Sequence, residues 1–243
     1  MFFFKQIYNT IRAWFEEAPH FTGTIIATER IGSRIQKVTI ALPEPISKPF
    51  PIGCYIQAQT SGCVPRAYSV AKANTTSFTL LVSFAGMGVG ARYFAEAPVG
   101  EKVVCYGPFD DFPYRYGTGR SKVFFATSTG VAPFRRMTEE ALKENVESVL
   151  LLGTPKEEDI AFKKDFEILA QNPLFRFIPV LSAGSAEWKG ARGFVTNHTA
   201  DIEDFLKKSD VYICGVPIMT MGVLDLLKKI GVPEKQIFVQ KFG

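Results

Sequence analysis

The chain has 243 residues, 47% of them hydrophobic, and a formal net charge of +4. This length fits one large domain or two of about 100 to 125 residues each. The small, dispersed positive charge argues against nucleic-acid binding but leaves room for an acidic protein partner.

The four cysteines are scattered and form no C-x-x-C pair: Cys54, Cys63, Cys105 and Cys214. This argues against a zinc site or an iron–sulfur module, and indicates free thiols in a reducing compartment. No apolar run reaches the roughly eighteen residues of a membrane span, and the amino terminus lacks the features of a secretory signal. We therefore expect a cytoplasmic protein.

The first segment, residues 1–19, is predicted to contain an amphipathic helix over residues 1–17. Its apolar residues recur at helical spacing: Phe4, Ile7, Ile11, Trp14 and Phe15. Such a helix can dock on a membrane surface or on a partner protein. Its polar face lacks the Lys/Arg excess of interfacial helices, which favours packing on the adjacent domain or on a second copy of the chain.

Residues 20–117 change to short β-prone runs separated by Gly and Pro. Six runs are predicted as strands: 22–30, 33–41, 55–59, 67–70, 77–84 and 102–106. Their number and the turn signals between them predict a small antiparallel barrel with one helical insert.

One of these strands begins with a cation, an aromatic ring and a hydroxyl, supplied by Arg66, Tyr68 and Ser69. Side chains alternate along a strand, so Arg66 and Tyr68 share one side while Ala67 and Ser69 share the other. A charge and a ring on one face suit a ligand with both a phosphate and a flat heterocycle. Taken alone, the stretch also fits an ordinary edge strand with its Arg in solvent.

The helical insert opens with three glycines, Gly86, Gly88 and Gly90. Unpaired backbone N–H groups at a helix start form an anion site, and glycines let a phosphate approach the chain closely. We therefore expect a phosphate-binding turn at residues 88–91.

A polar stretch at 116–120 is predicted to be a flexible link and to contain the domain boundary. Residues 118–243 then alternate strand, loop and helix. Five continuous apolar runs are predicted as strands: 122–126, 148–152, 175–181, 211–213 and 237–239. This alternation predicts a parallel sheet covered on both faces. With the strand order 3-2-1-4-5, a ligand would bind beyond the carboxyl ends of the first and fourth strands.

The loops after those two strands carry suitable residues. After the first strand, Thr129, Gly130 and Pro133 lie in a stretch of small residues that leads into a helix, where backbone N–H groups and hydroxyls can take a pyrophosphate. After the fourth strand comes the sequence C-G-V-P-I-M over residues 214–219. The alternatives are an ordinary strand-to-helix turn and a buried core thiol at Cys214.

Together these motifs resemble those of the ferredoxin-NADP reductase family of two-domain flavoproteins, over about residues 20–243. The R-A-Y-S stretch at 66–69 is similar to the family's R-x-Y-S, residues 128–134 resemble G-T-G-x-A-P-F, and residues 214–219 match C-G-x-P-x-M. The resemblance implies a six-stranded barrel that holds FAD, with FMN as the alternative, followed by a five-stranded NAD(P)-binding α/β domain.

The resemblance also implies roles. Arg66 binds the flavin phosphates, Tyr68 stacks on the isoalloxazine, Ser69 lies near flavin N5, Cys214 lies beside the reacting nicotinamide carbon, and Phe242 covers the flavin or caps the core. The expected cofactor-binding set is Arg66, Ala67, Tyr68, Ser69, Val82, Gly88, Val89, Gly90, Ala91, Thr129, Gly130, Pro133, Ser182, Cys214, Gly215, Pro217 and Met219. No metal site is expected.

The implied activity is hydride transfer from NADH or NADPH to the flavin, which then reduces a ferredoxin, flavodoxin, cytochrome, oxygenase component or small molecule. The third strand of the second domain is followed by Ser182 and no Arg, which favours NADH, although Lys156, Lys189 or Arg192 can substitute for that Arg.

The chain departs from the family pattern at four positions. Ala91 stands where the family usually has Ser or Thr, Asp110 and Ser128 stand where it has glycine, and Gln240 stands where it has Glu. These departures keep open a non-catalytic redox sensor. A component that works only inside a larger complex, and a reductase of a membrane acceptor reached through residues 1–17, are further alternatives.

Overall fold

The computed structural model describes residues 19–60, 65–84 and 88–241. The chain divides into two compact units, one ending at Pro113 and the other beginning at Tyr114. The helix predicted for residues 1–17, together with Cys63 and Phe242, lies outside the described residues. Within the described ranges, no helix has the length and hydropathy needed to cross a bilayer.

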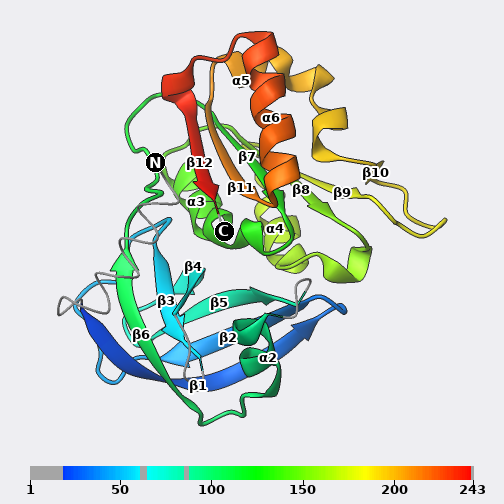
Figure 1. Ribbon diagram of the computed structural model, residues 1–243. Helices are drawn as coiled ribbons and strands as arrows, with labels where there is room; N and C mark the ends of the chain where they lie inside the picture. Colours follow the sequence, from blue (N-terminus) through cyan, green and yellow to red (C-terminus); the bar gives the residue numbers. More distant parts are fainter. Residues whose placement is uncertain (1–18, 61–64, 85–87, 242–243) are drawn as a thin grey trace. The chain divides into compact units, whose positions relative to one another are not determined.

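The first unit is a closed barrel of six antiparallel strands in the order β1-β2-β5-β4-β3-β6 (Figure 1). The predicted barrel is therefore confirmed. The strands are β1 (His20–Ile31), β2 (Ile35–Ala41), β3 (Tyr55–Gln59), β4 (Arg66–Ala73), β5 (Ser77–Ser83) and β6 (Lys102–Phe109), with helix α2 (Val89–Glu96) between β5 and β6.

The barrel forms because its strands alternate inward apolar residues with outward ones. In β2, Val38 and Ile40 are fully buried, whereas Lys37 and Thr39 between them are partly exposed. Helix α2 inserts Phe94, also fully buried, into the same core. The barrel thus places α2 beside the strands that carry the candidate site.

The second unit is a parallel sheet in the order β10-β9-β8-β7-β11-β12. Its strands are β7 (Lys122–Thr127), β8 (Ser148–Thr154), β9 (Phe175–Leu181), β10 (Ala191–Arg192), β11 (Asp210–Gly215) and β12 (Ile237–Lys241). The five predicted strands appear in the predicted order. The sixth, β10, was missed because two residues are too short to show an apolar run.

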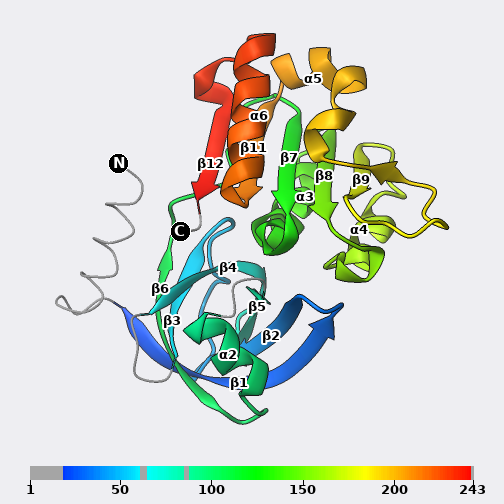
Figure 2. The same cartoon turned by 45° about the vertical axis from the view of Figure 1, so that its right-hand side comes forward.

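Helices cover both faces of this sheet (Figure 2). They are α3 (Ala132–Lys143), α4 (Lys163–Leu169), α5 (Glu203–Lys207) and α6 (Pro217–Ile230), with 3-10 turns η1 (Ser128–Val131), η2 (Glu157–Asp159), η3 (Val195–His198), η4 (Ala200–Ile202) and η5 (Glu234–Gln236). On one face α5 and α6 pack on the buried side chains of β7, β8 and β11. On the other, Phe134 of α3 packs on Phe124 of β7 at 5.1 Å between ring centroids.

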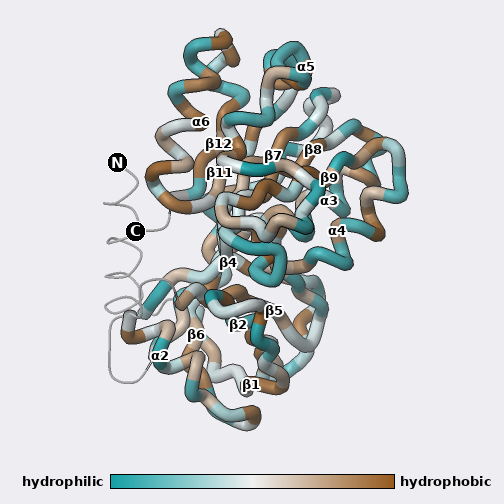
Figure 3. Tube along the Cα trace, turned by 90° about the vertical axis from the view of Figure 1, so that its right-hand side faces the viewer, coloured by the Kyte–Doolittle hydropathy of each residue, from teal (hydrophilic) through white to brown (hydrophobic). Residues whose placement is uncertain are grey.

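The central strands are apolar because both their faces are buried. In Figure 3 the tube is hydrophobic along β11 and largely hydrophilic along α5. Val123, Phe125, Val211 and Ile213 have no exposed surface.

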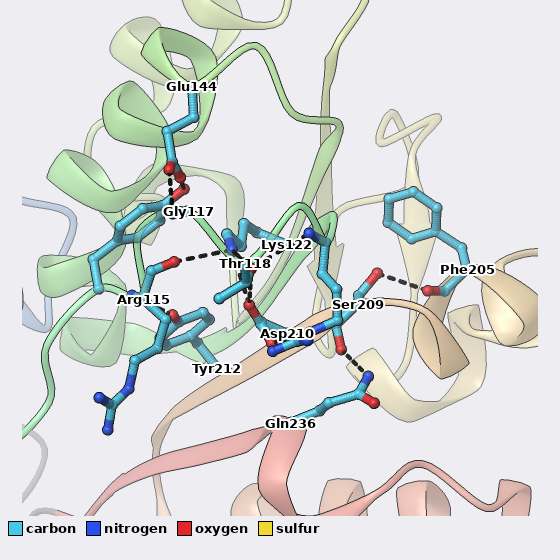
Figure 4. A network of polar contacts seen from close by, with 12 residues as sticks. Arg115, Gly117, Thr118, Lys122, Glu144, Phe205, Ser209, Asp210, Tyr212 and Gln236 are labelled. Atoms are coloured by element: carbon cyan, nitrogen blue, oxygen red, sulfur yellow. Dashed lines mark hydrogen bonds and ion pairs between the residues drawn. The ribbon is translucent and has the colours of Figure 1, made fainter.

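The amino-terminal ends of β7 and β11 are joined by a buried polar network (Figure 4). Asp210, fully buried, accepts hydrogen bonds from Lys122 Nζ (2.9 Å), Thr118 Oγ1 (2.7 Å) and Arg120 Nε (2.7 Å). Burial raises the pKa of Asp210, but these hydrogen bonds outweigh it and hold the pKa below its ordinary value.

The polar stretch 116–120, expected to be a flexible link, belongs to this network. Besides Thr118 and Arg120, Gly117 donates its backbone N–H to Glu144 at 2.7 Å. Tyr114 donates its hydroxyl to the same Glu144 at 2.7 Å. These bonds tie the stretch to the second unit, which is why the division of the chain falls before Tyr114 rather than after Gly117.

We predict that Asp210→Asn destabilises the second unit by about 3–5 kcal/mol, because it leaves the buried Lys122 charge without its partner. Denaturant unfolding at pH 7 measures this. The lowered pKa of Asp210 contributes stability that is complete above the unfolded carboxyl pKa of about 4 and is lost as the pH falls through the folded value. The free energy of unfolding of Asp210→Asn should therefore lack the part of the acid-dependent decrease that Asp210 causes in the wild type.

The matched control is Asp201→Asn, which breaks an exposed ion pair with Arg176. Its cost should stay below about 1 kcal/mol. Equal losses in the two variants would contradict a stabilising role for the buried network.

Candidate functional site

In the first unit, the predicted cation and ring lie against helix α2. Arg66 is exposed at the start of β4, and its Cγ lies beside Gly90, as does the Tyr68 hydroxyl. The Tyr68 ring packs edge-to-face on Phe94 at 5.4 Å. Burial raises the pKa of Tyr68 to about 12, against the opposing charge of Arg66, so the phenol is neutral at physiological pH.

The glycines of this turn have different roles. A Cβ at Gly90 would overlap the Tyr68 hydroxyl, so glycine is required there for α2 to approach β4. A Cβ at Gly88 would meet nothing within 4 Å, so the backbone at the helix start is open. Gly88 is the N-cap of α2 and the helix has no side-chain cap, which suits a phosphate-bearing cofactor such as FAD.

The other predicted residues of the first unit are placed as follows. Ser69 is 4% exposed, Val82 is 1% exposed in the barrel core, and Ala91 is 8% exposed in the same core. Only the backbone of Val82 can therefore face a ligand outside the barrel. Ala67 is half-buried and pairs with β3, and Val89 is exposed at the first position of α2.

In the second unit, the two predicted loops meet at the carboxyl ends of β7 and β11. A Cβ at Gly130 would lie 2.6 Å from the Cys214 carbonyl carbon and 2.8 Å from Gly215 Cα. Real Cβ contacts are never this short, so the η1 turn lies directly on the backbone of β11 only because residue 130 is glycine. Pro133 is buried in the first turn of α3 and starts that helix.

Thr127 holds the two loops together and was not among the predicted site residues. Its Oγ1 accepts a hydrogen bond from the Val216 backbone N–H at 3.0 Å. A Cβ at Gly215 would overlap this hydroxyl, so Gly215 is required for the contact. A hydroxyl residue at the end of a strand before a small-residue loop was the only signal for Thr127 in the sequence.

The Cys214 thiol is fully buried and faces the last strand. Its Sγ donates a weak hydrogen bond to Gln240 Oε1 of β12 at 3.6 Å. Burial raises the pKa of Cys214 well above its ordinary value, so the thiol stays protonated. Met219 is buried in α6, while Pro217 is exposed at its first position.

The loop after β9 contains Ser182 and is stabilised by hydrogen bonds from Arg192. Ser182 is exposed and donates its backbone N–H to Thr154 at 3.1 Å. The Arg192 guanidinium donates to the carbonyls of Gly184 (3.0 Å), Ser185 (2.5 Å) and Trp188 (3.0 Å). This arginine therefore stabilises the loop conformation.

These features can be compared with known proteins. The family model of the oxidoreductase NAD-binding domain matches residues 124–225. Among solved structures, a ferredoxin reductase in carbazole 1,9a-dioxygenase superposes with a TM-score of 0.83 at 20% identity, covering 93% of this chain and 70% of that one. At this identity the likeness shows the fold alone.

Two curated relatives extend the comparison. The F component of the Na(+)-translocating NADH-quinone reductase of Haemophilus influenzae is 26% identical over 275 residues, which cover 90% of this chain and 66% of that component. Ferredoxin--NADP reductase B of Sorangium cellulosum is 33% identical over 193 residues, which cover 74% of this chain and 79% of that enzyme. Given this identity and coverage, together with the flavin and nucleotide motifs placed above, the chain belongs to the ferredoxin-NADP reductase family of FAD-containing NAD(P)H reductases.

Proposed function

We propose that this chain binds FAD on its barrel, oxidises a nicotinamide coenzyme bound to its parallel sheet, and passes the electrons to an acceptor protein. The observation that carries this proposal is the backbone contact of Gly130 with Cys214 and Gly215. It brings two small-residue loops together where the strand order reverses, which is where open parallel sheets bind nucleotides.

When bound, the flavin supplies the redox chemistry, since it accepts a hydride from the reduced nicotinamide and releases electrons to the acceptor. Arg66 would hold the flavin phosphates beside the open start of α2. The neutral Tyr68 ring would present its free face to the flavin, because its edge contact with Phe94 fixes its plane.

Cys214 would act by position rather than as an acid or base. A buried, protonated thiol cannot serve as a general base at neutral pH. Its hydrogen bond to the neutral Gln240 adds no second titrating group to the pair. Gly215, partly exposed next to the buried Cys214, therefore offers a compact stretch of backbone that a nicotinamide ring can approach.

The direct test is the absorbance spectrum of the purified protein during anaerobic addition of NADH. We expect a flavin spectrum that bleaches at about one equivalent of coenzyme. A protein that contains flavin but bleaches with neither NADH nor NADPH would be a redox sensor, and the proposed activity would be wrong.

We predict that Arg66→Ala weakens FAD binding about ten- to a hundredfold, which corresponds to one lost hydrogen bond to a charged group of about 1.5–3 kcal/mol. Titration of the apoprotein with FAD, followed by flavin fluorescence, measures the dissociation constant. Lys72→Ala is the matched control, since Lys72 is an exposed cation further along the same strand. Retention of wild-type affinity in Arg66→Ala would exclude Arg66 from the flavin site.

For the coenzyme we favour NADH, because two of the three cations near the loop after β9, Arg192 and Lys156, contact other groups of the protein. The Arg192 guanidinium is occupied by three carbonyls of that loop. Lys156 lies 3.8 Å from the Glu158 carboxylate. A 2'-phosphate requires a cation at the ribose, and neither of these side chains is poised to supply one.

We predict a kcat/KM for NADH at least tenfold above that for NADPH. Replacing Ala183, exposed in the same loop, by Arg should raise kcat/KM for NADPH about tenfold and leave that for NADH within twofold. Lys189→Ala serves as the control for the remaining exposed cation of the loop. A wild-type preference for NADPH that falls in Lys189→Ala would reverse the assignment.

The similarity to a component of an NADH-quinone reductase over 90% of this chain favours a second candidate, an electron-transfer component of a larger assembly. Steady-state turnover of the isolated protein with ferricyanide and with a ferredoxin separates the two. A self-sufficient reductase reduces both, whereas a dedicated component of an assembly reduces only the small acceptor.

A further inference from the structure

The loop between β2 and β3 is apolar for a segment at the protein surface. Over residues 42–52 it reads L-P-E-P-I-S-K-P-F-P-I, so that every residue except Glu44, Ser47 and Lys48 is Leu, Ile, Phe or Pro. Apolar surface that is gathered in one place, rather than scattered singly, is typical of an interaction site.

Part of this loop is buried in the barrel and part of it stays at the surface. Phe50 is buried and packs on Phe21 and Phe78, at 6.1 and 5.4 Å between ring centroids. Leu42 and Ile46 donate their backbone N–H groups to the neighbouring carbonyls of residues 76 and 75, so the two side chains lie in one region. The partly exposed Phe21, Leu42 and Ile46, with the exposed Pro43 and Pro45, are called the end surface below.

The chain enters the barrel at this same end. Thr24 of β1 pairs with Ala41, the last residue of β2, and Phe21 precedes Thr24 on the same strand. The carbonyl of Pro19 accepts a hydrogen bond from the Gly107 backbone N–H at 3.0 Å, which holds the chain where β1 begins. Residues 1–18 therefore join the barrel beside the end surface.

The segment that joins there has a length suited to this surface. Residues 1–17 are predicted to form an amphipathic helix, which at about 1.5 Å per residue would be ~25 Å long. Only Ala18 and Pro19 separate the segment from β1. A short link of this kind gives the segment an effective concentration on the order of millimolar at nearby surfaces, which favours docking within one chain.

The charges of the segment point the same way. Lys5 and Arg12 are balanced by Glu16 and Glu17, so residues 1–17 carry no net charge from their side chains. Helices that lie on anionic lipid surfaces have an excess of Lys and Arg on the polar face. The composition therefore favours an apolar protein surface over a membrane.

We propose that the apolar side of residues 1–17 docks on the end surface of its own barrel and covers Phe21, Leu42 and Ile46. This inference does not rest on the proposed function, because it involves neither the flavin nor the coenzyme. It also selects among the partners that the sequence left open, which were the adjacent domain, a second copy of the chain and a membrane.

Tryptophan fluorescence tests the proposal in the full chain. The chain has two tryptophans, Trp14 in the segment and Trp188 in the second unit, so Trp188→Phe leaves Trp14 as the only one. We expect acrylamide to quench Trp14 far less in the folded protein than in urea, without lipid present. This protection should persist on about tenfold dilution, because docking within one chain does not depend on concentration.

Two variants in this background locate the contact. Ile46→Asp on the barrel and Ile11→Asp in the segment should each lower the ratio of docked to undocked segment at least about tenfold, because a charge replaces a buried apolar side chain. Quenching of Trp14 should rise accordingly. The double variant should be quenched no more than either single one, since both changes break the same contact. Pro45→Asp, at an exposed residue of the end surface, takes the place of Ile46→Asp if that variant does not fold.

The matched controls are Ile168→Asp and Asn9→Asp. Ile168 is 63% exposed on α4 of the second unit, and Asn9 belongs to the polar side of the segment. Both controls should leave the quenching of Trp14 as it is in the parent protein.

Equal quenching of Trp14 in the folded and urea-unfolded parent would overturn the inference. Protection that disappears on dilution would assign the segment to a second copy of the chain, and protection that requires phosphatidylglycerol vesicles would assign it to a membrane. Protection that survives the change in the end surface or Ile11→Asp would place the contact elsewhere. Each of these outcomes contradicts the proposal and leaves the proposed function untouched.

Discussion

The second unit depends on a close approach of two backbones, that of the η1 turn and that of the last residues of β11. A Cβ at position 130 would overlap the backbone of Cys214 and Gly215, so glycine at 130 permits the approach from the η1 turn. A Cβ at position 215 would overlap the Thr127 hydroxyl, so glycine at 215 permits the approach from β11. The geometry of the candidate coenzyme site therefore requires glycine at both positions, as well as the side chains that surround them.

The opposite ends of the same two strands are joined in a different way. At the carboxyl ends the link is a neutral hydrogen bond from Val216 to Thr127, while at the amino-terminal ends Asp210 and Lys122 form a fully buried ion pair. Buried charges are costly unless every hydrogen-bonding site is used, and here Thr118 and Arg120 complete the set. The link between β7 and β11 at the candidate coenzyme edge is therefore uncharged, and the ionic network lies at the opposite ends of the same two strands.

The sequence predicted the barrel and the order of the five long parallel strands, because both depend on periodic apolar runs that a single sequence displays. It also located the loops of Gly130 and Cys214, since parallel strands place their carboxyl ends at one edge. It could not predict the hydrogen bonds from Arg192 to three backbone carbonyls, because these depend on the course of an irregular loop. For the same reason it took residues 116–120 as a flexible link, although Asp210, some ninety positions away, holds them in place.

The four departures from the family pattern do not have equal consequences. Ala91 lies in the barrel core at 8% exposure, so its methyl group contributes to packing where a hydroxyl would need a partner. Asp110 avoids the left-handed region, and the positive φ of that turn falls on Gly107 instead. Gln240 accepts a hydrogen bond from the Cys214 thiol through a neutral amide. A Glu at this buried position would place a carboxylate inside the sheet, which is costly. Only Ser128 retains a cost that no contact within the described residues offsets.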